Sequence, residues 1–204
     1  MERSLKRGLV GAKAPRQLQN FLDQHLPALE TPASAAGWKR RAERVRGQML
    51  ELFLRGHDAS LLSETARVEW GEIIQTGKGY HICKLRYERY PGMWVPALFY
   101  EPTRLRGQVP AVLNSNGNHI GGKAVDYKQG RCINLAKRGV LALNVEFIGM
   151  GELRADADHN RLALLNLCGV AGIGVFYLLM KRGLDVLLSH PRADPARTAM
   201  TGLS

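Results

Sequence analysis

The pattern of hydrophobic and polar positions divides the chain into two parts. Up to about residue 60, apolar residues recur every three or four positions, which is typical of amphipathic helices. The first series consists of Leu18, Phe21, Leu22 and Leu26. Pro27 ends this series, and a second helix is predicted from Ser34, a suitable N-cap, to Gly56. We therefore predict an N-terminal helical extension over residues 1–60.

Polar and apolar residues alternate from about residue 66, which indicates β-strands. The clearest alternation covers residues 80–87, and an apolar run follows at residues 94–100, with turns predicted at 76–79 and 91–92. This part of the chain predicts an antiparallel meander. Because Pro96 has no backbone N–H, it predicts a position in the last strand where no ladder N–H is needed, such as an edge or a bulge.

From residue 109, short apolar strands alternate with helical segments. Strands are predicted at residues 109–113, 140–145 and 197–201, and helices at 124–138 and before Ser189. Such alternation predicts right-handed βαβ crossovers and a parallel sheet that is covered on both faces. The fold class is therefore α/β, with an antiparallel meander that leads into a parallel βαβ sheet within residues 61–204.

Composition changes this picture little. The net charge of +11 comes from Lys and Arg spread along the chain, and the cluster at residues 39–46 lies on one face of the second predicted helix. A solvated helix face explains that cluster better than a phosphate-binding stripe, so we expect no nucleic-acid partner. Residues 1–9 lack the apolar run of a signal peptide. The longest apolar stretch, 168–180, is shorter than the about 18 residues of a membrane span, so we expect no membrane association and, by default, a cytoplasmic protein.

The three cysteines are widely spaced in apolar segments and form no CxxC or Cys/His pattern. They are Cys83, Cys132 and Cys168. This arrangement predicts buried free thiols, with no disulfide framework and no metal site.

The carboxyl ends of parallel strands are where functional residues gather. Residues 114–123, Asn-Ser-Asn-Gly-Asn-His-Ile-Gly-Gly-Lys, follow the first parallel strand. A glycine-bearing loop can hold a phosphate, but this one lacks both the GxxxxGK[ST] and the GxGxxG spacing, and a plain polar connection is the simpler alternative. Residues 146–151 place an acidic residue before a Gly-x-Gly turn, for which a tight turn is the simplest explanation.

The third strand end, residues 201–204, reads Thr-Gly-Leu-Ser. A short strand that runs into Gly-x-Ser is the first half of the G-x-S-x-G nucleophile elbow. A serine hydroxyl becomes a good nucleophile only with a base to accept its proton and donors to hold the oxyanion. Ser204 is therefore the candidate nucleophile.

Together these segments resemble the α/β-hydrolase superfamily, in particular its acetyl xylan esterase-like and dienelactone hydrolase-like branch. The resemblance covers residues 68–204, with Asn-Gly-Asn at 116–118 similar to the His-Gly-x oxyanion loop and residues 194–204 similar to the fifth strand and the elbow. It implies that Ser204 is the nucleophile and that the backbone N–H of Asn118 is an oxyanion donor. Asn116 stands where a histidine is usual, at a position that supports the loop.

The resemblance also implies that the acid, the histidine and the second oxyanion donor follow Ser204. We therefore expect an incomplete α/β-hydrolase fold over residues 61–204, truncated after its fifth strand by an incomplete reading frame, and an inactive, poorly stable 204-residue chain. His119 and His159 are alternative bases within the chain. The remaining histidines are predicted to be surface or structural residues.

The activity that the resemblance implies is that of a serine carboxylic ester hydrolase working through an acyl-serine intermediate without metal or cofactor. Small-molecule or carbohydrate esters, above all acetylated carbohydrate, are the expected substrates. Two alternatives remain open: a peptidase of the prolyl-oligopeptidase type, which shares the strand order and elbow, and a non-catalytic binding protein with a hydrolase fold. The first normally carries a large β-propeller, which a stretch of about 60 residues cannot form, and the missing acid and histidine would decide the second.

Overall fold

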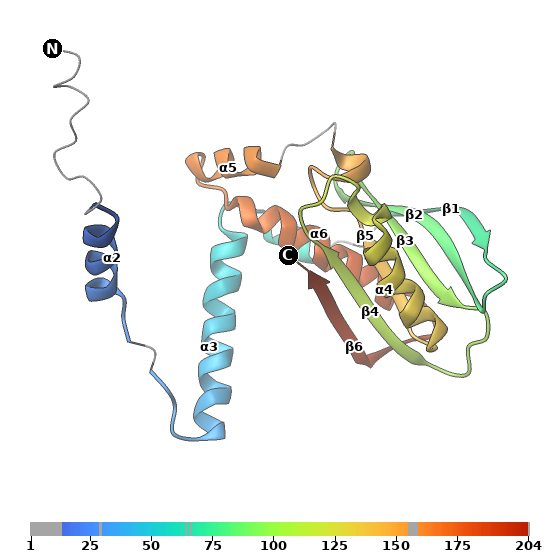
Figure 1. Ribbon diagram of the computed structural model, residues 1–204, viewed down its shortest axis with the longest axis horizontal. Coiled ribbons are helices and arrows are strands. Elements are labelled where there is room, and N and C mark those ends of the chain that lie inside the picture. Colours follow the sequence, from blue (N-terminus) through green and yellow to red (C-terminus); the bar gives the residue numbers. More distant parts are fainter. Residues whose placement is uncertain (1–13, 29, 64, 66, 155–158, 204) are drawn as a thin grey trace, which may run out of the picture. The chain divides into compact units, whose positions relative to one another are not determined.

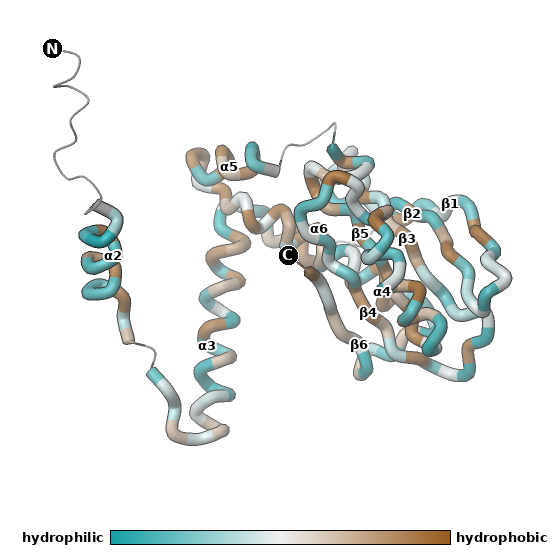
Figure 2. The backbone as a smooth tube through the Cα atoms, viewed as in Figure 1, coloured by the Kyte–Doolittle hydropathy of each residue, from teal (hydrophilic) through white to brown (hydrophobic). Residues whose placement is uncertain are grey.

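The computed structural model describes residues 14–28, 30–63, 65, 67–154 and 159–203 (Figure 1). The chain forms two compact units, Met1–Arg46 and Gly47–Ser204. The first unit contains α2 (Ala14–His25) and the beginning of α3 (Ala35–Leu54), which confirms the two helices expected from the apolar spacing. In Figure 2 both helices alternate between hydrophilic and hydrophobic positions, as the helical period requires.

A six-stranded mixed sheet with the order β1-β2-β3-β5-β4-β6 forms the second unit. Its strands are β1 (Val68–Gln75), β2 (Tyr80–Tyr90), β3 (Met93–Pro102), β4 (Val109–Asn116), β5 (Leu141–Val145) and β6 (Ala193–Leu203). β1, β2 and β3 pair antiparallel, β3 also pairs antiparallel with β5, and β4 pairs in parallel with both β5 and β6. The predicted meander that leads into a parallel sheet is confirmed.

Helices cover both faces of the sheet, as the βαβ pattern predicts. α4 (Asp126–Lys137) connects β4 to β5, and α5 (Ala163–Leu167) and α6 (Gly172–Leu188) connect β5 to β6. The described residues also form short 3-10 helices: η2 (Ala59–Leu62), η3 (Gly122–Ala124), η4 (Gly151–Leu153) and η5 (His159–Leu162). Alternate residues of the fully buried β5 serve the two faces, because Leu143 lies in the same core cluster as α6 residues and Ala142 in the cluster that contains Cys132 and Ala136 of α4.

Several element boundaries differ from the predictions. β4 continues through polar residues to Asn116, and β6 begins at Ala193, because the neighbouring strands supply hydrogen-bond partners that a local pattern does not reveal. The general prediction that no ladder N–H is needed at Pro96 holds, but neither example applies, since β3 is an interior strand and its register shift against β2 lies at residues 88–90. The Pro96 carbonyl accepts the Glu146 N–H at 2.9 Å, so its missing donor faces the point where β5 has already ended.

The cysteines are free, but they are not all buried. Cys83 and Cys132 lie in the core, whereas Cys168, which was also predicted to be buried, is exposed in the turn after α5. No single helix among those described is long and apolar enough to cross a membrane. Only the bent pair Asn160–Leu167 and Gly172–Leu188, with 118° between its halves, meets the length and composition criteria together.

Candidate active site

The carboxyl ends of β5, β4 and β6 lie at one edge of the sheet. Asn114 pairs with Asn144 of β5, and Asn116 pairs with Leu203 of β6. The loop that contains Asn118 therefore leaves the sheet beside the end of β6. Ser204 itself lies outside the described residues. A hollow of about 340 Å³ opens at this edge, lined by Ser115, Asn116, Gly117, Phe147 and residues 200–203.

The direction of the Asn118 N–H follows from a buried lysine. Lys128 of α4 is 1% exposed, and its Nζ donates a hydrogen bond of 3.2 Å to the carbonyl of Gly117. The C=O and N–H of a trans peptide point in opposite directions, so this contact turns the Asn118 N–H away from α4. Among the described residues this N–H has no protein acceptor, which leaves it available to a ligand. Burial is the main cause that lowers the pKa of Lys128, opposed by the nearby charge of Glu146.

Two buried amides tie the end of β4 to β5. The Nδ2 of Asn116 donates to Asn144 Oδ1 and to the Val145 carbonyl, both at 2.6 Å. Asn144 Nδ2 in turn donates to the carbonyl of Lys123 at 3.0 Å, at the far end of the loop. Asn116 thus supports the loop that contains Asn118 through buried hydrogen bonds to β5.

A buried carboxylate connects this loop to the turn after β5. Glu146 is 1% exposed; its Oε1 accepts the backbone N–H of Lys123 at 2.8 Å, and its Oε2 accepts Lys123 Nζ at 2.9 Å and the Glu152 N–H at 3.2 Å. Because a buried charge is costly unless it is paired and hydrogen-bonded, these contacts explain how Glu146 is tolerated here.

Two glycines press against that carboxylate from opposite segments. A Cβ at Gly122 would lie 2.0 Å from Glu146 Oε1, and one at Gly151 would lie 2.2 Å from Oε2; both residues have positive φ, +55° and +51°. Residues 146–151 form the predicted tight turn with two glycines at positive φ, Gly149 at +79° and Gly151 at +51°, and Gly151 is required in addition by its close approach to the Glu146 carboxylate. The Gly151 N–H also donates to the carbonyl of Ile120 at 3.1 Å, which joins the two segments directly.

His119 and His159 are the alternative catalytic bases predicted within the chain. His119 is exposed on the loop that contains Asn118, and its Nδ1 accepts a hydrogen bond of 3.1 Å from the Gly121 N–H. In the neutral ring Nε2 then carries the proton, so this orientation leaves no nitrogen free to act as a base. The side chain of His159 lies outside the described residues. His57 bonds to the carbonyl of Ala171 at 2.8 Å, a structural contact.

Sequence reasoning missed three residues of this edge: Lys123, Lys128 and Asn144. Asn144 gave a signal, because it is a polar residue inside an otherwise apolar predicted strand. The lysines gave none, since buried and exposed lysines look alike in a sequence.

No family model matches the sequence, and the comparison with curated proteins gave no significant match. Solved structures do share the fold. A Bacteroides fragilis structure provisionally named an acetyl xylan esterase is 19% identical, with a TM-score of 0.74 over 97% of this chain and 55% of its own. The acetyl xylan esterase from Paenibacillus sp. R4 is 18% identical (TM-score 0.56, 90% of this chain and 55% of its own). Acetyl xylan esterase 1 from Thermoanaerobacterium sp. JW/SL YS485 is 15% identical (TM-score 0.60, 77% and 50%).

The chain thus spans about half the length of these solved structures. The likeness extends over the sheet and its covering helices at low sequence identity, so it concerns the fold. The chain has part of an α/β-hydrolase fold of the kind found in acetyl xylan esterases.

Proposed function

We propose that the chain contributes the nucleophile and one oxyanion donor of a serine carboxylic ester hydrolase. The observation that carries this proposal is the pairing of Asn116 with Leu203 at the carboxyl edge of the parallel strands. In the sequence, Asn118 follows the first of these residues by two positions and Ser204 directly follows the second, which supports their assignment to one site.

The proposed reaction begins when the Ser204 hydroxyl attacks the ester carbonyl and passes its proton to a base. The Asn118 N–H donates a hydrogen bond to the oxyanion of the tetrahedral intermediate. The alcohol leaves with the proton from the base, and water then releases the acid from the acyl-serine by the reverse sequence. The base, its orienting acid and the second oxyanion donor are proposed to come from sequence that follows Ser204, as the order of the fold requires. No metal or cofactor takes part.

Lys128, Asn116 and Glu146 have positioning roles in this proposal. Each holds a part of the loop around Asn118 from the buried side, where a preorganised donor costs no rearrangement during the reaction. An acetyl ester is the proposed substrate, with acetylated carbohydrate as the alcohol side, supported by the names of the similar structures and by the small hollow beside residues 200–203.

The test is the replacement Ser204→Ala in the protein extended past residue 204. Release of acetate from a small acetyl ester and from acetylated xylan should fall to near the uncatalysed level, because no acyl intermediate can form. Ser189→Ala is the matched control, since Ser189 is the C-cap of α6 and its hydroxyl donates a hydrogen bond to the Val186 carbonyl. Unchanged turnover in Ser204→Ala would refute the assigned nucleophile. The 204-residue chain alone should release no acetate.

A further inference from the structure

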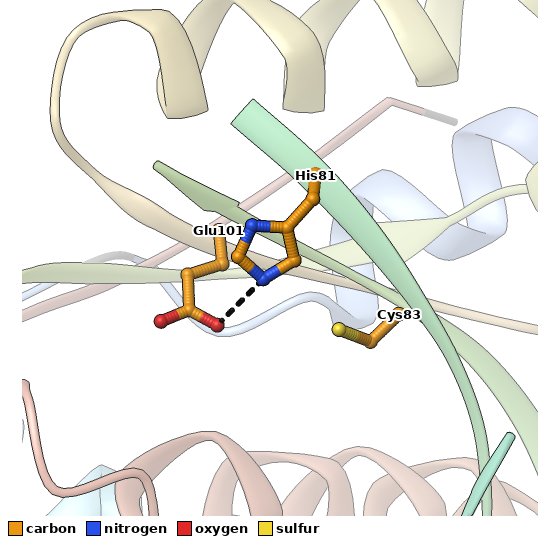
Figure 3. Close-up of side chains that lie close together, drawn as sticks. All are labelled: His81, Cys83 and Glu101. Atoms are coloured by element: carbon orange, nitrogen blue, oxygen red, sulfur yellow. Dashed lines mark hydrogen bonds and ion pairs between the residues drawn. The ribbon is translucent and has the colours of Figure 1, made fainter. Parts of the chain in front are cut away.

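A second group of reactive side chains lies at the opposite edge of the sheet. His81 and Cys83 are two residues apart on β2, so they project from the same face, and Glu101 of β3 pairs directly with His81. Figure 3 shows the three side chains turned toward one another. This end of β3 pairs with the beginning of β5, through Tyr100 and Ala142, and so lies away from the strand ends that border Asn118.

The spacing of the three ligand atoms suits a metal ion. His81 Nε2 lies 3.1 Å from Glu101 Oε2, and the Cys83 sulfur lies within 4.8 Å of a ring nitrogen of His81 and of a carboxylate oxygen of Glu101. Zinc bonds of 2.0–2.3 Å in a tetrahedron place neighbouring ligand atoms about 3.3–3.6 Å apart. The nitrogen and oxygen are already near that separation, and the sulfur needs to approach by at most about 1.2–1.5 Å.

The surroundings of the cluster are partly closed to water. The Cys83 residue is 7% exposed, and the side chains of His81 and Glu101 are 19% and 21% exposed. This leaves an opening through which an ion can enter while most of the cluster is desolvated. Thiolate and imidazole ligands together select zinc or a similar borderline metal over magnesium or calcium, which prefer oxygen alone.

His190, from the segment between α6 and β6, approaches the other oxygen of the same carboxylate. Its Nε2 lies 3.4 Å from Glu101 Oε1, its ring stacks on Phe99 at 5.2 Å, and its Nδ1 accepts the Arg192 N–H at 3.2 Å. A carboxylate that binds a metal through one oxygen is commonly oriented by a hydrogen bond to the other. His190 is in the position to supply that bond.

The position of Cys83 distinguishes a metal site from an ordinary ion pair between Glu101 and two histidines. An ion pair does not require the thiol, yet Cys83 projects into the same space. A cysteine thiolate is a preferred ligand of zinc, so the position of Cys83 beside His81 and Glu101 favours a metal site.

We propose that His81 Nε2, Cys83 Sγ and Glu101 Oε2 bind a zinc ion, with water in the fourth position and His190 orienting the carboxylate. The ion would link β2 and β3 to the beginning of β6 through His190. Because it lies at the other edge of the sheet from Asn118, its role is structural and independent of ester hydrolysis.

The proposal is tested with Co²⁺ as a spectroscopic substitute for zinc in the purified protein. One equivalent of Co²⁺ should produce a sulfur-to-cobalt charge-transfer band and the visible bands of a tetrahedral ion, and Zn²⁺ should abolish both by displacement. Cys83→Ser should remove the charge-transfer band, whereas Cys132→Ser, a buried cysteine on α4, should keep it. Elemental analysis after dialysis should find one zinc per chain in the wild type.

Two further variants distinguish the proposed metal ligand His81 from His190, which is proposed to orient the carboxylate. His81→Gln should lose stoichiometric zinc, whereas His190→Gln should weaken zinc binding by about 10–100-fold while keeping the charge-transfer band. The wild-type measurement does not depend on any variant folding, and the absence of a charge-transfer band there would overturn the proposal. A band that persists in Cys83→Ser would also overturn it. Ester hydrolysis in the Ser204 test is a separate readout, so either proposal can fail alone.

Discussion

Replacement of Gly122 by alanine tests the most tightly packed contact of the candidate site. The new Cβ would lie 2.0 Å from Glu146 Oε1 and 2.7 Å from its Cδ, far inside van der Waals contact. The carboxylate cannot simply rotate away, because its two oxygens accept hydrogen bonds from the backbone N–H and Nζ of Lys123 and from the Glu152 N–H. The loop or the turn after β5 must therefore shift.

Two costs add in this variant. A non-glycine residue at positive φ costs about 1–2 kcal/mol. Overpacking of a closed site costs about 1–3 kcal/mol more. We expect Gly122→Ala to lower the free energy of unfolding by about 2–5 kcal/mol, a large part of the about 5–15 kcal/mol of a typical domain.

The assay is equilibrium urea unfolding followed by circular dichroism. Gly107→Ala is the matched control, because Gly107 has φ +65° but a Cβ added there would meet no atom within 4 Å. This control should therefore lose only the backbone contribution of about 1–2 kcal/mol. Gly151→Ala, on the other side of the same carboxylate, should behave like Gly122→Ala. Equal losses in Gly122→Ala and Gly107→Ala would refute the importance of the carboxylate contact.

Two other predictions concern buried titratable groups. In the protein extended past Ser204, Lys128→Met should lower kcat for an acetyl ester, with KM little changed, toward the about 10²–10³-fold loss that follows removal of an oxyanion donor. Replacement of the exposed Lys137 by Met should leave kcat unchanged. Equal kcat values in the two variants would contradict the positioning role of Lys128. Burial raises the pKa of Cys132 from 9.0 to about 12, so above pH 9.0 the unfolded chain loses this proton first and stability falls as pH rises. In Cys132→Ser, the free energy of unfolding should fall less steeply with pH, by up to about 1.4 kcal/mol per pH unit, as measured by urea unfolding between about pH 9 and pH 10.5. Identical slopes of unfolding free energy against pH in the variant and the wild type would contradict this prediction.

Local periodicity was enough to predict the succession of helices and strands. Residues close together in the sequence are enough to show the helical spacing before residue 60, the alternation in β2 and the short apolar runs of β4 and β5. The loop at residues 114–123 and the turn at 146–151 could be singled out for a similar reason, since each directly follows a predicted parallel strand. Ser204 stays a prediction.

Tertiary structure decided what depends on residues far apart in the sequence. The packing of Gly122 and Gly151 on Glu146 needs the loops after β4 and β5 to meet, and the burial of Lys128 needs α4 to lie under the Gly117 carbonyl. The register of β2 against β3 decides that Glu101 stands beside His81, which no spacing within either strand reveals. A sequence specifies which residues share a face of one element, whereas contacts between elements depend on register and packing. Both proposed sites are built from such contacts.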